Sequence, residues 1–210
     1  MKKTIYLALA LATGMVGFTS CEDQLDIEQK GVVDADVFYN NPDNALGSLT
    51  AAYQGFVGNV LGRQPDLGGP GIYTPYKNML NLCADDIYGA GGDYTDHEFN
   101  NTLNEFRYDT SAETCRFLYK GLFLSVYTCN LVMDQFGLAD NATVKQYVAE
   151  ARVLRAYDYF LLAALWGTPP LVDHVLPGDA LPYNCNNDEN YKLDQKGLFE
   201  WVAKQCEEAE

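Results

Sequence analysis

The feature that most constrains the fold is a pair of long segments in which apolar residues recur at helical spacing. The first runs from Thr110 to Gly137 and the second from Ala142 to Trp166. Residues three and four positions apart share one face of a helix, so each segment should form an amphipathic helix with one buried stripe. Because the loop between them is short, the two helices are expected to pack antiparallel as a helical hairpin.

Helical periodicity also covers residues 43–62, 75–85 and 194–210, whereas strand signals are sparse. Thr110 followed by Glu113 has the spacing of a capping box and predicts the start of the first long helix. The sequence therefore predicts an all-α fold of helical hairpins. Gly, Pro, Asn and Asp are concentrated in three long connections, residues 62–76, 89–110 and 168–193. Connections of this length are usually functional or disordered, and the aromatic residues between Tyr73 and Tyr108 argue against disorder.

The first residues have the pattern of an export signal. Lys2 and Lys3 precede an apolar run from Ile5 to Phe18, which is shorter than the roughly 20 residues that a transmembrane helix needs. The run ends in Phe18-Thr19-Ser20-Cys21, which resembles the lipobox of bacterial lipoproteins. We expect residues 1–20 to be a lipoprotein signal peptide, Cys21 to carry lipid, and residues 21–40 to form an acidic tether and N-terminal arm. The alternative is an ordinary secretory peptide in which Cys21 is incidental.

The charge of the chain excludes one class of partner. Lys and Arg total 14 against 29 Asp and Glu, which gives a net charge of −15, so nucleic acid is not an expected ligand. The acidic tether should extend away from a lipid surface and resembles signals that send lipoproteins to the surface of some Gram-negative bacteria.

The other cysteines form no C-x-x-C pair, and their spacing matches no metal site. We interpret them as buried thiols, with disulfides left open as the alternative; they are Cys83, Cys115, Cys129, Cys185 and Cys206.

The acidic residues of the loops could be catalytic, or they could simply be solvated surface groups. A glycosidase needs two carboxylates at a defined separation, and spacing alone selects no such pair from the acids of residues 85–98. His97 and His174 accompany no nucleophile motif. We therefore expect no catalytic residues, no cofactor and no metal. One alternative stays open, because the oxygen ligands of residues 93–98 have a spacing that suits calcium, although they do not match an EF-hand loop.

The aromatic connections supply the side chains that lectin-like sites use. Flat rings stack against the C–H patches of sugars, while carboxylates, amides and Arg hydrogen-bond the hydroxyls. The alternative is that these tyrosines only fix a long loop onto the helices. The candidate ligand-binding residues are Tyr73, Tyr76, Tyr88 and Tyr94 for stacking, with Asp86, Asn100, Asn101 and Arg107 for hydrogen bonds.

Several segments, read in order, resemble the SusD/RagB family of outer-membrane nutrient-binding lipoproteins. Residues 25–39 and 51–53 are similar to the family's N-terminal motif, and Leu118-Tyr119 followed by Asn130 is similar to a helix motif of the same family. The most specific segment is 150–172, an Arg-Ala-Tyr helix that ends at Gly167 and continues into Pro169-Pro170.

The resemblance covers Cys21 to Glu210 and implies a scaffold of tetratricopeptide-like hairpins. Residues 41–210 would be the N-terminal helical domain of such a protein, truncated at its C-terminus, because family members are longer. The resemblance further implies a lipid-anchored, surface-exposed outer-membrane protein that binds glycans without altering them. Its partner would be a SusC-like TonB-dependent transporter. The alternatives are a protein of the same fold that binds peptides or another nutrient, and a glycoside hydrolase of the cell envelope.

Overall fold

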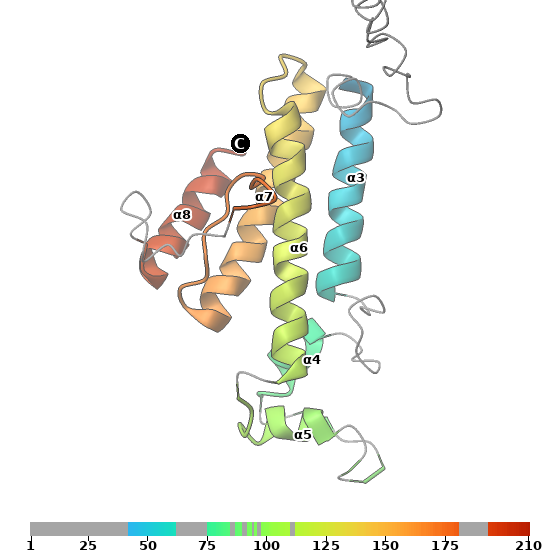
Figure 1. Ribbon diagram of the computed structural model, residues 1–210, viewed down its shortest axis with the longest axis vertical. Coiled ribbons are helices and arrows are strands. Elements are labelled where there is room, and N and C mark those ends of the chain that lie inside the picture. Colours follow the sequence, from blue (N-terminus) through green and yellow to red (C-terminus); the bar gives the residue numbers. More distant parts are fainter. Residues whose placement is uncertain are drawn as a thin grey trace, which may run out of the picture. The chain divides into compact units, whose positions relative to one another are not determined.

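The computed structural model describes residues 42–61, 75–84, 87–89, 92–93, 95, 98–109, 112–180 and 193–210. Every regular element in these ranges is helical, which confirms the all-α prediction (Figure 1). No helix among these residues has the length and apolar character needed to cross a membrane. The elements are a 3-10 turn Pro42–Asn44, α3 Ala45–Phe56, a π-helical turn Val57–Leu61, α4 Pro75–Asn81, α5 Glu98–Asn104, α6 Glu113–Phe136, α7 Ala142–Trp166 and α8 Gln195–Glu207.

The predicted hairpin is formed by α6 and α7, which lie side by side (Figure 1). The helices are antiparallel, since Tyr119 near the start of α6 contacts Trp166 at the end of α7, with ring centroids 5.2 Å apart. Asn141 begins α7, because its side-chain oxygen accepts the backbone N–H of Thr143 at 2.9 Å. Gly167 ends it with a φ of 79°, a conformation that favours glycine.

Two details of the sequence prediction are wrong. First, α6 begins at Glu113 with Ala112 at the N-cap and no side-chain cap, so Thr110, which lies outside the described residues, is not the capping residue. Second, Glu98–Asn104 is the short helix α5, although residues 89–110 were predicted to be an irregular connection. Asn104 at the end of α5 donates to the carbonyl oxygens of Leu82 and Ile87, at 3.2 and 3.1 Å. These bonds attach α5 to the chain that follows α4.

Apolar side chains form two clusters along the α6–α7 pair. The first joins this pair to α4 and α8, and includes Leu118, Leu122, Leu162 and Leu198, none of which has measurable solvent exposure. The second lies where the pair meets α3. Burial of these side chains supplies the main favourable free energy of folding.

A buried polar network ties the hairpin to α8 and to the segment after α7. The Arg155 guanidinium donates to Asn130 Oδ1 and to Gln205 Oε1, both at 2.7 Å, and also to the Asp173 carbonyl oxygen. Asn130 donates in turn to the carbonyl oxygens of Val172 and His174, at 3.0 and 3.1 Å. One charged group therefore fixes residues from four parts of the chain.

A second buried polar group, Asp158 on α7, has a different character. Its side chain is fully buried, and neither carboxyl oxygen has a hydrogen-bond partner of standard geometry among the described residues. Burial raises the pKa of this carboxyl well above its usual range, and the nearby Ser125 hydroxyl opposes the shift only in part. The protonated acid is therefore favoured in the folded protein.

We expect the Asp158→Asn variant to be more stable than the wild type at neutral pH, by more than about 1 kcal/mol. In the unfolded wild-type chain the carboxyl ionises near its ordinary pKa, whereas the folded protein retains the proton to higher pH. The free energy of unfolding therefore falls as the pH rises above that ordinary value, until the folded carboxyl also ionises. Asn has the shape of the neutral acid and cannot ionise, so this part of the decline disappears.

Urea unfolding of both proteins from pH 4 to pH 8 measures this difference. Asp140→Asn, which changes an exposed carboxylate, is the matched control and should follow the wild-type curve. Parallel curves for wild type and Asp158→Asn would show that Asp158 is ionised in the folded state.

Candidate functional site

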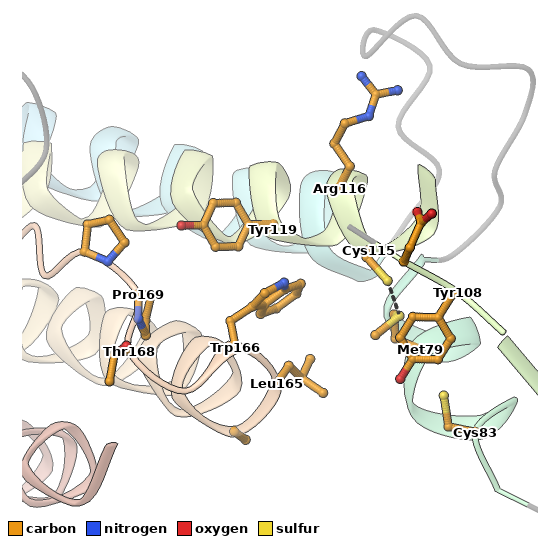
Figure 2. Close-up of a pocket in the computed structure, with 13 residues that line it drawn as sticks. Met79, Cys83, Tyr108, Cys115, Arg116, Tyr119, Leu165, Trp166, Thr168 and Pro169 are labelled. Carbon is orange, nitrogen blue, oxygen red and sulfur yellow. Dashed lines mark hydrogen bonds between the residues drawn. The ribbon is translucent and has the colours of Figure 1, made fainter. Parts of the chain in front are cut away.

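A pocket of about 990 Å³ lies where the first turns of α6 meet the end of α7 (Figure 2). Its walls come from α4, from the segment that follows α5, from α6 and α7, and from the turn after α7. Their lining residues are Met79, Cys83, Tyr108, Asp109, Cys115, Arg116, Tyr119, Ala164, Leu165, Trp166, Thr168, Pro169 and Pro170.

Two aromatic rings form one wall of this pocket. Tyr119 lies in the second turn of α6 and Trp166 is the last residue of α7, so the antiparallel hairpin places them together. Their planes meet at 68°, and each side chain is half-buried (Figure 2). Phe123, one turn further along α6, supports Tyr119 with a centroid distance of 4.9 Å. The packing therefore holds two aromatic surfaces at a fixed angle beside the cavity.

Hydrogen bonds from the core fix the turn that contains Pro169 and Pro170. The Val172 N–H donates to the Tyr159 hydroxyl at 2.6 Å, and this hydroxyl lies 3.2 Å from the Pro170 carbonyl oxygen. Tyr159 is fully buried, so its position is set by the core. The network of Arg155 and Asn130 fixes the next residues, and the wall formed by residues 168–170 is thus rigidly attached to the hairpin.

Two charged residues also line the pocket. Arg116 in the first turn of α6 forms an ion pair with Glu113 at 3.6 Å, and its guanidinium lies over the Phe117 ring at 4.9 Å from the centroid. Asp109 lines the same region from the segment that precedes α6. The pocket thus offers a carboxylate and a guanidinium near its aromatic wall.

Sulfur atoms form the remaining wall. The Cys115 thiol lies 3.4 Å from the Met79 sulfur, and Cys83 lines the same wall from the turn after α4 (Figure 2). Burial raises the pKa of both thiols, which favours the neutral form. Cys129 is a buried free thiol, as expected, whereas Cys206 is a free but exposed thiol, so its predicted burial is wrong; Cys185 lies outside the described residues.

None of the predicted ligand-binding residues that the structure describes lines this pocket. Tyr76 on α4 is hydrogen-bonded through its hydroxyl to that of Tyr157, at 2.7 Å, and Tyr88 is 66% exposed. Asn101 is buried in α5, and Arg107 forms an ion pair with Glu105. Cys21, Tyr73, Asp86 and Tyr94 lie outside the described residues.

Asn100 has a clear structural role. Its amide donates to the Gly89 carbonyl oxygen at 3.0 Å and accepts a hydrogen bond from Asn78 at 3.2 Å. It thus links α5 to α4 and to the connection between them. A role of Tyr88 or Arg107 in ligand binding stays a prediction.

The sequence interpretation missed Tyr119 and Trp166, although both lie in motif segments that it had identified. The available signal was the hairpin itself, because an antiparallel pair brings the start of its first helix next to the end of its second. Tyr108, Asp109 and Arg116 carried no comparable signal, since their approach depends on how the segment after α5 is routed.

The predicted calcium ligands are described only in part. Asp93 accepts hydrogen bonds from the Thr95 N–H at 2.8 Å and from the Thr95 hydroxyl at 2.6 Å, and Glu98 begins α5. Asp96 lies outside the described residues. Elsewhere in the described chain, no three His, Cys, Asp or Glu side chains are placed to hold a metal ion.

Comparison with solved structures agrees with the fold. A SusD-like carbohydrate-binding protein from Bacteroides fragilis superposes with a TM-score of 0.62 at 19% identity, over 82% of this chain and 31% of that protein. Surface glycan-binding protein A from Bacteroides fluxus gives 0.61 at 23% identity, over 80% of this chain and 33% of that protein. The helical hairpins are therefore of the tetratricopeptide-like kind found in these proteins.

Sequence comparison identifies the family. The starch-binding protein SusD of Bacteroides thetaiotaomicron is 26% identical over 98% of this chain, which spans 37% of that protein's length. A SusD-like family model, described as starch-binding and associating with the outer membrane, matches residues 76–204, more than half of the chain. The chain therefore belongs to the SusD-like family.

Proposed function

We propose that this protein binds glycans or oligosaccharides non-covalently in the pocket between α6 and α7. The observation that carries the proposal is the corner formed by the Tyr119 and Trp166 rings, in a pocket that Asp109 and Arg116 also line. Aromatic faces suit the apolar C–H surfaces of sugar rings, while the carboxylate and the guanidinium suit hydroxyl groups. SusD-like glycan-binding proteins are non-catalytic, so the role is capture and not hydrolysis.

We further propose that the protein is held at the outer membrane by lipid on Cys21, after removal of residues 1–20. The acidic residues 21–40 would then separate the helical domain, residues 41–210, from the membrane surface. A SusC-like TonB-dependent transporter would receive the glycan. Support for these steps comes from the sequence pattern and from the family, whose description includes association with the outer membrane.

Affinity electrophoresis of residues 21–210 in gels that contain starch, xylan, galactomannan or pectin tests the proposal. We expect at least one polysaccharide to retard the protein, with no release of reducing sugar on incubation. Release of reducing sugar would instead indicate an envelope hydrolase. Retardation by none of the polysaccharides would contradict glycan binding and favour the alternative of a peptide or another nutrient.

A further inference from the structure

The cation that lines the pocket already has a counter-ion within the protein. Arg116 Nη2 lies 3.6 Å from Glu113 Oε1, one helical turn earlier, and both side chains are about half exposed. Arg116 also lies over the Phe117 ring, with its guanidinium carbon 4.9 Å from the ring centroid. Arg116 thus has an intramolecular counter-ion before any ligand arrives.

The start of α6 has a second positive feature that Glu113 offsets. The first backbone N–H groups of a helix carry a partial positive charge, and Ala112 provides no side-chain cap. Glu113 is the acidic residue of this first turn. Its carboxylate pairs with Arg116 and, as the acid of the first turn, offsets the partial positive charge of the helix terminus.

The other charges near the pocket also disfavour an anionic ligand. Asp109 adds a carboxylate to the pocket wall, and the chain as a whole carries a net charge of −15. An anionic polysaccharide would approach against this field, and the pocket would not offer it an uncompensated cation. An uncharged glycan meets neither obstacle, because its hydroxyl groups hydrogen-bond to Asp109 and Arg116 without a change of charge.

We propose that Glu113 acts as an internal counter-ion that makes this pocket selective for uncharged glycans over glycans that carry carboxylate or sulfate groups. This inference rests on the proposed function and deepens it, since it names the ligand class and the residue that determines it. Glu113 acts through Arg116 and through the helix terminus, so it is a specificity-determining residue that need not contact the sugar.

The test compares one polysaccharide with its own carboxymethyl derivative, so that the sugar backbone stays the same while carboxylates are added. Soluble starch and carboxymethyl starch are the first pair, and the best neutral binder of the panel replaces starch if it binds more tightly. We expect wild type to prefer the neutral form, and Glu113→Gln to bind the carboxymethyl form about threefold to fivefold more tightly than wild type does. The affinity of Glu113→Gln for the neutral form should not change, and the gain should shrink at 0.5 M NaCl, where charges are screened.

Glu200→Gln on α8 is the matched control. Glu200 also pairs with a cation on its own helix, Lys196 at 3.4 Å, so the variant removes an equal charge away from the pocket. The inference is overturned if wild type binds both forms equally, if Glu113→Gln leaves the affinity for the carboxymethyl form unchanged, or if Glu200→Gln raises it as much. Failure to bind any neutral or charged polysaccharide would instead refute the proposed function itself.

Discussion

Replacement of Arg155 by Met is expected to lower the free energy of unfolding by about 3–5 kcal/mol. The guanidinium is buried and donates to Asn130, to Gln205 and to the Asp173 carbonyl oxygen, and it lies over the Trp201 ring. Met has a similar length but no donors, so all three acceptors lose the guanidinium at once, and of these Gln205 Oε1 keeps a second donor, Arg152 at 3.2 Å. Urea unfolding should show a lower midpoint with an unchanged dependence on urea concentration.

Two further variants define the cause of this loss. Lys145→Met removes an exposed cation whose ion pair with Asp140 spans 3.6 Å, and should change stability by less than about 0.5 kcal/mol. Arg155→Lys keeps the charge but lacks the planar fork that reaches Asn130 and Gln205 together, so it should recover only part of the loss. Full stability of Arg155→Lys would show that charge alone, and not this geometry, holds the network.

The overall fold could be predicted because its information is local. Periodicity identified α6 and α7, and the short loop between them required an antiparallel hairpin. The signal that ends α7 is equally local, since Gly167 is followed by Pro169 and Pro170. Each of these signals acts over a few residues, so no knowledge of tertiary contacts was needed.

The candidate site depends on contacts between residues far apart in the sequence. Tyr108 follows α5, and the hydrogen bonds of Asn104 at the end of α5 fix the path of the chain before Tyr108. No periodicity in the sequence predicts this path. The roles of Arg155 and Asp158 are likewise invisible in the sequence. Both are ionisable residues on α7, three positions apart. Only the structure shows that the Arg155 guanidinium donates to three acceptors, whereas neither carboxyl oxygen of Asp158 has a hydrogen-bond partner among the described residues. Local patterns therefore predict the helices. The candidate site instead depends on the path of the loops and on the hydrogen bonds of buried polar groups.

Replacement of Trp166 by Leu is expected to weaken glycan binding by about tenfold to thirtyfold. Leu retains an apolar contact with Tyr119 at the end of α7 but removes the flat surface on which a sugar ring would stack. The helical circular dichroism should not change, because the hairpin is held by the buried residues of α6 and α7. Isothermal titration calorimetry with the polysaccharide fragment that binds wild type most tightly measures the loss.

Two comparisons show where the ligand lies. Tyr127→Leu removes a half-exposed aromatic residue of α6 that does not line the pocket, and should leave the affinity unchanged. Tyr88→Ala tests the loop surface that the sequence had indicated, since this ring is 66% exposed and stands apart from the pocket. If Tyr88→Ala abolishes binding while Trp166→Leu does not, the ligand lies on the loop and the pocket assignment is wrong. If only Trp166→Leu weakens binding, the corner between α6 and α7 is the binding surface, because a sugar stacked there loses its contact with the ring while the tyrosines of the loop remain in place.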